Sequence, residues 1–570
     1  MPYRSPVSDY EFIFEHVVPI APLSETEKFE DATADVTSAI LTEAGKLSDD
    51  IIAPLQRPGD LNPARLENGV VRTSPGFAEG YAAIAEGGWV GIAADPEYGG
   101  MGLPMAVATA VNDMMSGASI SLQLCPLLSQ GQIEALEHHA SDELKATYLP
   151  KLTSGEWSGT MNLTEPHAGS DVGALRTKAE PQGDGTYKIT GQKIYITWGD
   201  ADFLDNVCHL VLARLPGAVP GPKGISLFMV PKYFPKEDGT LGEANSLRVV
   251  SLEHKMGIHG SPTCVMEYDG ATGWLIGEEH NGMACMFTMM NNARLGVGIQ
   301  GVGVAEAAYQ HALGYALDRT QGKPVMKGGK GTIIDHADVR RMLTSMRADI
   351  FAARAIGAAC ANAIDMATAT GDAAHKARAA LLTPIAKSFG AEVGMDVAQQ
   401  GVQIWGGMGF VEESGAAQFS RDVRITAIYE GTNGIQAMDL VARKMMDGGE
   451  AAAALFEEIE SHAEAAKGTH PKLAGAVWNA CETLRETTEW LVAQGDMNDR
   501  FAGAVPYMMA FARVLGAHYH LKAAMTGDAT REKLAAFYIE RLLPEHTGLC
   551  AHARVGADGI FALSVDELAA

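Results

Sequence analysis

The hydrophobic pattern of the chain changes character twice. Between about residues 26 and 153, apolar positions recur at three- and four-residue spacing, as in 29–49 and 132–148, which predicts amphipathic helices. From residue 155 to about 277, short β-branched or aromatic runs alternate with Gly, Pro and Asp turns, which predicts strands. Helical spacing returns near residue 281 and continues toward the end. We therefore expect a mainly α protein with an inserted β domain.

This pattern divides the chain into four expected domains. They are an N-terminal helical domain (1–154), a middle β domain (155–278), a helical bundle (279–447) and a C-terminal helical extension (448–570). A Gly-Gly pair at 448–449 marks the start of the extension. The predicted strands are 187–190, 207–212, 225–230 and 265–268, and the predicted bundle helices are 286–317, 337–368, 373–400 and 434–446.

Composition narrows the class of protein. With 570 residues, 47% of them hydrophobic, the chain can fill several cores. Its 44 Lys and Arg against 70 Asp and Glu give a net charge of −26, which disfavours nucleic acid or an anionic membrane as partner. No uninterrupted apolar run reaches the length of about 18 residues needed for a membrane span, so none is expected.

The cysteines and histidines suggest neither disulfides nor a metal. Seven scattered cysteines never form a CxxC pair, which indicates a reduced, cytoplasmic protein. The apolar patch at 12–23 contains acidic, histidine and proline residues, so it does not read as a signal peptide. The histidines at 138, 139, 254, 259 and 280 lack the spacing of metal ligands, and we expect no metal site.

The stretch Ile-Tyr-Glu-Gly-Thr at 428–432 holds the main candidate for chemistry. Glu430 lies between an aromatic ring and a glycine, and glycine lets a bound molecule approach the backbone closely. A carboxylate enclosed by apolar surface has its pKa raised toward neutral pH, which suits a general base. Most glutamates are solvated surface acids, so this motif needs support from elsewhere in the chain.

Three other motifs supply that support. Residues 161–171 (Met-Asn-Leu-Thr-Glu-Pro-His-Ala-Gly-Ser-Asp) place hydroxyls around Pro and Gly in a loop suited to a polar heterocycle. Residues 191–199 (Gly-Gln-Lys-Ile-Tyr-Ile-Thr-Trp-Gly) read as a strand, whose tyrosine could simply pack across the sheet. Residues 403–409 (Gln-Ile-Trp-Gly-Gly-Met-Gly) could be an ordinary helix cap.

Together and in this order, the four motifs resemble those of acyl-CoA dehydrogenases, and the extension resembles a long bacterial subgroup of that family. The resemblance implies an N-terminal helical domain, a middle β-barrel and a C-terminal four-helix bundle, followed by extra helices. It also implies FAD as cofactor, an acyl-CoA thioester as substrate, electron-transfer flavoprotein as acceptor, and a homo-oligomer, most simply a dimer.

The resemblance also assigns site residues. Those implied to bind FAD are Met161, Leu163, Thr164, Gly169, Ser170, Tyr195, Ile196, Thr197, Arg319, Gln403, Gly406, Gly407 and Thr432. The arginine and the 403–407 stretch would reach the flavin nucleotide of a neighbouring subunit. Those implied to bind substrate are Ser170, Arg294, Tyr429 and Gly431. The chain departs from the family pattern at Tyr195, where Trp or Phe is usual, and at Asn291, where Asp is usual.

The implied reaction is α,β-dehydrogenation, in which Glu430 takes the α proton and the flavin takes the β hydride. Residues 5–12, 252–261 and 270–277 resemble a branch of the subgroup that oxidises a thioether acyl-CoA during dimethylsulfoniopropionate breakdown. Three alternatives stay open: a dehydrogenase of ordinary short or medium acyl-CoAs, an acyl-CoA oxidase, and a non-catalytic structural subunit.

Overall fold

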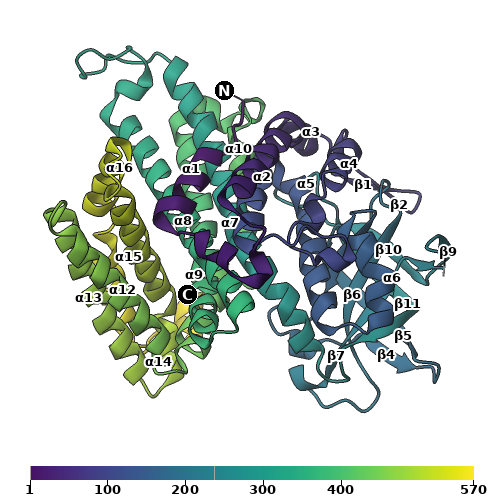
Figure 1. The fold of residues 1–570 in the computed structure, drawn as a ribbon. Coiled ribbons are helices and arrows are strands. Elements are labelled where there is room, and N and C mark those ends of the chain that lie inside the picture. The colour runs from purple at the N-terminus through teal and green to yellow at the C-terminus, as the bar shows by residue number, and fades with distance from the viewer. Residues whose placement is uncertain (1, 237) are drawn as a thin grey trace. The chain divides into compact units, whose positions relative to one another are not determined.

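The computed structural model describes residues 2–236 and 238–570, and it combines long helices with a β domain (Figure 1). The helices are α1 (Val7–Phe12), α2 (Ala34–Leu47), α3 (Gln56–Leu61), α4 (Phe77–Glu86), α5 (Met105–His139), α6 (Asp142–Thr153), α7 (Gly282–Asp318), α8 (Ala337–Thr370), α9 (Ala373–Trp405), α10 (Ala416–Val423), α11 (Asn433–Val441), α12 (Glu450–Ala466), α13 (Pro471–Ala493), α14 (Met497–Ala502), α15 (Ala504–Ala524), α16 (Ala529–Arg541), α17 (Glu545–Ala553) and α18 (Val565–Ala569).

Two short strands precede α5, and the other strands lie between α6 and α7. They are β1 (Arg65–Glu67), β2 (Val70–Arg72), β3 (Trp157–Asn162), β4 (Lys178–Pro181), β5 (Thr186–Thr197), β6 (Asn206–Arg214), β7 (Ile225–Pro231), β8 (Tyr233–Pro235), β9 (Leu241–Ala244), β10 (Leu247–Leu252) and β11 (Thr263–Ile276). The expected fold class, mainly α with an inserted β domain, is therefore confirmed.

The chain forms two compact units. The helical unit contains the residues up to Gly45, 104–117 and 294–570; the β-containing unit contains 46–103 and 118–293. Each unit draws on segments that are far apart in the sequence. The four domain boundaries expected from the sequence stay predictions.

The seven-stranded sheet closes on itself. Its strand order is β10-β11-β5-β4-β6-β3, and β7 pairs with both β11 and β6, so that β6, β7, β11, β5 and β4 form a closed ring. Every residue of β7 and all but the last of β6 are buried, which explains why these strands read as continuous apolar runs. Inside the ring, Val211, Phe228 and Tyr268 belong to one apolar core.

The structure corrects three expected helix boundaries. The helix expected at 29–49 begins later, at Ala34, since residues 27–29 form a separate 3₁₀ turn. Residues 132–148 do not form one helix, because α5 ends at His139 and the side chain of Ser141 caps α6, accepting a hydrogen bond of 3.4 Å from Leu144 N–H. The helix expected at 434–446 ends earlier, at Val441, since residues 443–445 tighten into a 3₁₀ turn.

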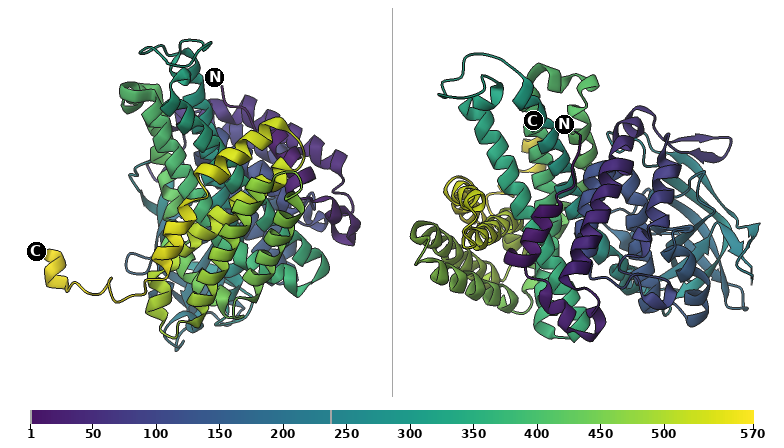
Figure 2. Two further views of the ribbon diagram at one scale, coloured as in Figure 1. Left: turned by 90° about the vertical axis from the view of Figure 1, so that its left-hand side faces the viewer. Right: turned by 45° about the horizontal axis from the view of Figure 1, so that its top comes forward.

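In the helical unit, α8 and α9 pack along each other, and α15 of the C-terminal extension packs on α8, α9 and α11. Figure 2 shows the extension helices lying side by side, with the last residues leading away from them toward α18. Among the described residues, α8 is the one helix long and apolar enough to cross a membrane, and 78% of its most apolar window is buried inside the protein.

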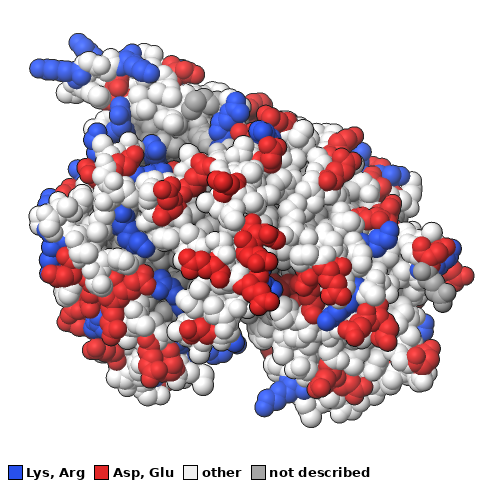
Figure 3. Space-filling view, in the orientation of Figure 1, with Lys and Arg blue, Asp and Glu red and all other residues white. Residues whose placement is uncertain are grey.

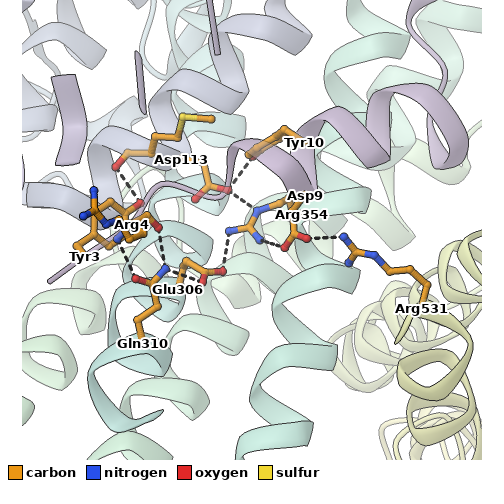
Figure 4. Close-up of polar contacts among 10 residues, drawn as sticks. Tyr3, Arg4, Asp9, Tyr10, Asp113, Glu306, Gln310, Arg354 and Arg531 are labelled. Atoms are coloured by element: carbon orange, nitrogen blue, oxygen red, sulfur yellow. Dashed lines mark hydrogen bonds and ion pairs between the residues drawn. The ribbon is translucent and has the colours of Figure 1, made fainter. Parts of the chain in front are cut away.

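A buried charge cluster ties this unit together (Figure 4). The Arg354 side chain on α8 is fully buried; its Nε is 2.8 Å from Oδ2 of Asp113 (α5) and its Nη2 is 3.1 Å from Oε2 of Glu306 (α7). Its Nη1 lies 3.4 Å from Oδ2 of Asp9 (α1), which also pairs with Arg531 of α16. One guanidinium thus joins the N-terminal segment to three other helices. On the face drawn in Figure 3, acidic side chains are more widespread than basic ones, in keeping with the net charge of −26.

Candidate active site

The end of β3 and the end of β5 meet in the β-containing unit. Met161 lies in β3, and Leu163 and Thr164 follow that strand directly. Ile194 N–H donates a hydrogen bond of 3.0 Å to the Thr164 carbonyl, which places this threonine beside Tyr195. Tyr195 is 61% exposed, and its backbone has a φ of +60°, which few residues other than glycine adopt.

A buried ion pair fixes this junction. The ammonium of Lys193, fully buried, lies 2.8 Å from Oε1 of Glu165 and donates a hydrogen bond of 3.0 Å to the Leu163 carbonyl. The same carboxylate accepts hydrogen bonds from the backbone N–H groups of Arg176 (2.7 Å) and Thr177 (3.0 Å). Burial lowers the pKa of Lys193 to about 8, an effect that the Glu165 charge opposes.

The exposed groups at this junction fit a planar polar heterocycle such as a flavin. Tyr195 is exposed and brings an aromatic ring, while the half-buried Thr164, Met161 and Leu163 bring a hydroxyl and apolar surface. Gly169 and Ser170 are exposed in the following loop, and a Cβ added at Gly169 would meet nothing within 4 Å. Ile196, in contrast, points its side chain into the core of the sheet, while Thr197 pairs with Thr263.

Glu430 lies in the helical unit, in a short connection that leads into α11. Its φ is +57° and that of the following Gly431 is +84°. Gln436 Nε2 donates a hydrogen bond of 3.1 Å to the Glu430 carbonyl, and the Tyr429 hydroxyl donates to Gln300 Oε1. The Thr432 hydroxyl caps α11 by accepting a hydrogen bond of 3.2 Å from the Ile435 N–H. These contacts hold the backbone on either side of the carboxylate.

The electrostatics around Glu430 suit a general base. Burial raises the pKa of Glu430 to about 7, although the charges of Arg294 and Lys387 oppose the rise. Arg294 lies on α7, 3.9 Å from the Asp439 carboxylate. A carboxylate with a pKa near the working pH is a stronger base than an ordinary glutamate and still largely ionised.

The expected residues Arg319, Gln403, Gly406 and Gly407 gather at one end of the helical unit. The rings of Tyr315 (α7) and Trp405 (α9) stack with centroids 4.0 Å apart, which joins the two helix ends that carry these residues. Arg319 and Gln403 are exposed, and a Cβ added at either glycine would meet nothing within 4 Å. This end is therefore open to a large ligand or to another protein surface.

Among the described residues, one group of side chains of the kinds that bind metal ions lies close together. Possible ligand atoms of Glu458, His462 and His518 lie within 4.8 Å of one another. The sequence pattern did not single out these residues, because two lie on α12 and one on α15. The Glu458 carboxylate already pairs with the guanidinium of Arg378, with one contact at 3.3 Å, and we assign no metal to the group.

Four family profiles match the chain. They are described as acyl-CoA dehydrogenase N-terminal (66–156), middle (160–271) and C-terminal (280–446) domains and as an acetyl-CoA dehydrogenase C-terminal-like domain (455–564). The chain belongs to the acyl-CoA dehydrogenase family. This dehydrogenase is thus an oxidoreductase, and because the family is FAD-dependent, the expected cofactor is confirmed.

Individual relatives resemble the dehydrogenase in sequence or in fold over nearly its full length. A 3-methylmercaptopropionyl-CoA dehydrogenase of Ruegeria pomeroyi is 45% identical over 520 residues, covering 89% of this chain and 88% of that protein. The broad-specificity linear acyl-CoA dehydrogenase FadE5 of Mycobacterium tuberculosis is 33% identical, covering 95% and 96%. A solved acyl-CoA dehydrogenase from Bacillus anthracis, complexed with FAD, shares the fold with a TM-score of 0.75 at 21% identity, covering 93% and 90%.

Four residues that shape the two sites were given no role by the sequence analysis. Lys193 and Glu165 stand inside the quoted motifs, and a lysine in an otherwise strand-like run was the available signal. Lys387 lies in the middle of α9 and Gln300 in the middle of α7, where nothing in the local pattern distinguishes them from surface residues. Only the packing of the helices brings them toward Glu430.

Proposed function

We propose that the dehydrogenase oxidises 3-methylmercaptopropionyl-CoA to methylthioacryloyl-CoA, a step in the demethylation route of dimethylsulfoniopropionate breakdown. The substrate assignment rests on the 45% identity, over 89% of the chain, to the Ruegeria pomeroyi enzyme of that name. The chemistry rests on one observation: Glu430 is held in a constrained backbone conformation with its pKa raised to about 7.

In this proposal Glu430 removes a proton from the α carbon of the thioester. Bound FAD supplies the hydride acceptor for the β carbon, a role no ordinary side chain can fill. The Glu430 backbone N–H donates to the thioester oxygen and stabilises the negative charge that develops there. The loss of one proton and one hydride leaves the new carbon–carbon double bond, and the proton rests on the Glu430 carboxylate.

The other expected residues bind and orient. Met161, Leu163, Thr164 and Tyr195 contact the flavin ring, and Lys193 with Glu165 fixes the backbone that presents them. Ser170, Arg294, Tyr429 and Gly431 contact the acyl-CoA. We further propose a homodimer, in which Arg319, Gln403, Gly406, Gly407 and Thr432 contact FAD, those at the open helix ends reaching the cofactor of the partner. Electron-transfer flavoprotein is the proposed acceptor, and the cytoplasm the proposed location.

A dehydrogenase of ordinary linear acyl-CoAs is the second candidate. It is favoured by the 33% identity, over 95% of the chain, to a relative named as having broad specificity for linear substrates. Both candidates use the same base and cofactor, because the difference between them lies in how the site accepts a thioether rather than a methylene chain. Oxidase and structural-subunit roles have no such support.

The test is the visible spectrum of the FAD-loaded protein before and after anaerobic addition of 3-methylmercaptopropionyl-CoA or butyryl-CoA. We expect bleaching of the flavin band, faster with the thioether substrate, and a rate lower by about 10²- to 10⁴-fold in Glu430→Gln. Equal rates with both substrates would support the broader dehydrogenase. A Glu430→Gln variant that bleaches as fast as the parent protein would overturn the assignment of the base.

A further inference from the structure

A buried lysine anchors the segment that carries Glu430. The Lys387 side chain on α9 is fully buried, and its ammonium donates a hydrogen bond of 2.9 Å to Oδ1 of Asn433. Asn433 in turn donates from Nδ2 to Oε1 of Glu392, 2.7 Å away, also on α9. Because Asn433 is the first residue of α11, this chain of contacts fixes the start of that helix against α9.

The connection from Tyr429 to Thr432 is thus held at both ends. On one side the Tyr429 hydroxyl bonds to Gln300 of α7; on the other, Asn433 is held by Lys387. Between them, Glu430 has a positive φ that an L residue keeps only when its surroundings require it. A loss of the Lys387 contact releases the end of the connection that follows Glu430, where Asn433 begins α11.

Lys387 also supplies charge to the same place. The charged groups that face Glu430 are Arg294 from α7 and Lys387 from α9. Arg294 shares its charge with Asp439 on α11, which Arg443 also contacts, and Lys444 lies close to that group. The groups that face Lys387 are Glu430, Glu392 and Arg294. Among the described residues, the ammonium donates its hydrogen bond to a neutral amide, so its positive charge also acts on the nearby carboxylates.

We propose that Lys387 is a positioning residue for the catalytic base, which holds the 429–433 backbone through Asn433 and whose positive charge favours the ionised form of Glu430. This inference rests on the proposed role of Glu430. An apolar side chain of similar size would fill the same space but would provide neither the hydrogen bond to Asn433 nor the charge. The free-energy cost of burying the Lys387 ammonium is therefore offset by its attraction to the ionised Glu430 carboxylate.

The two contributions predict different kinetic signatures. Removal of the charge raises the pKa of Glu430, since one of the two cations that favour its ionised form is lost. The acid limb of kcat/KM then moves to higher pH by about one unit or more, the typical effect of a nearby opposite charge. Removal of the tether alone lowers kcat at every pH and leaves the acid limb where it was.

The experiment compares three variants of the FAD-loaded protein over the full pH profile. Lys387→Gln keeps a donor for Asn433, one atom shorter, and removes the charge; we expect a raised acid limb and, at high pH, a kcat within a few-fold of the parent. Asn433→Ala keeps the charge and removes the tether; we expect a lower kcat and an unchanged acid limb. Lys376→Met, on the exposed face of α9, is the matched control and leaves both quantities unchanged.

The outcomes separate this inference from the proposed function. An unchanged acid limb in Lys387→Gln, with normal FAD content, would overturn the role of the charge. A normal kcat in Asn433→Ala would overturn the tether. If Glu430→Gln itself keeps full activity, the proposed base is wrong, and this result is independent of any Lys387 variant.

Discussion

Replacement of Arg354 by Met tests how the helical unit is held together. The substitution keeps an unbranched apolar stem and removes the guanidinium that faces Asp9, Asp113 and Glu306. Removal of one partner of a buried ion pair costs about 3–5 kcal/mol, because the other charge stays buried without compensation. With three carboxylates left behind, we expect the upper part of that range, about 4–5 kcal/mol.

The cost should depend on pH in a defined direction. In the parent protein, burial opposes the ionisation of Asp9, but the charges of Arg354 and Arg531 hold its pKa below the usual value. For Glu306, burial raises the pKa, and the charge of Arg354 reduces this rise. Without Arg354 the folded-state pKa of Glu306, which burial already raises, rises further above its unfolded value, and the pKa of Asp9 rises as well. Stability in the variant is then retained at low pH and lost as the pH rises through the folded-state pKa values.

The assay is thermal unfolding followed by circular dichroism at about pH 5.5 and pH 8, with parent and variant at equal protein and FAD concentration. For a unit of this size, at about 1–2 °C per kcal/mol, a loss of about 4 kcal/mol corresponds to a fall in Tm of about 4–8 °C at the higher pH, and to a smaller fall at the lower pH. The control is Arg341→Met on the same helix, whose ion pair is exposed and worth less than about 1 kcal/mol. A fall in Tm that is the same at both pH values, or no larger than that of the control, would refute the reasoning.

Three further predictions concern the site. Since Glu430 acts as a base with a pKa of about 7, kcat/KM should rise with pH and level off above that value; a profile that falls across the same range contradicts the assignment. Gly431→Ala should lower kcat markedly, because the residue has a φ of +84° and the added Cβ would lie 2.7 Å from Nε2 of Gln436. Stopped-flow flavin reduction measures the rate, and an unchanged rate would contradict the need for glycine at this position. Lys193→Met leaves Glu165 without its buried cation, so the amount of FAD bound per protein should fall. The ratio of visible to ultraviolet absorbance measures it, and a full FAD content would exclude a role of this ion pair in holding the flavin-binding loop.

The fold could be predicted from the sequence where one local pattern dominates. Strands β6 and β7 are buried along nearly their whole length, so their apolar runs were unambiguous. The apolar spacing continues through the break between α5 and α6, so it predicts one helix there; Ser141, followed by Glu143, is the local signal that a new segment begins, and the structure shows it as the cap of α6. The closure of the sheet through β7 depends on pairings between distant strands, which no local pattern encodes.

The candidate site was predictable to the extent that its residues stand in short motifs. Glu430, Thr164 and Tyr195 were identified in this way, and their roles stay predictions. Ile196 illustrates the limit of the method, since the motif includes it but the strand alternation turns its side chain into the sheet core. Lys387 illustrates the opposite case: a lysine in the middle of a helix is usually solvated, and only the packing of α9 against α11 buries it.

The contact between Arg531 and Asp9 has a consequence for how the protein is made. The two residues are 522 positions apart, yet both belong to the cluster around Arg354. Synthesis starts at the N-terminus, so Asp9 of α1 cannot pair with Arg531 until α16 has been made. At about 5–20 residues per second, the interval between the two residues is roughly half a minute or more. During that interval Asp9 lacks one of its two arginine partners, so a helix synthesised late completes the environment of one synthesised early.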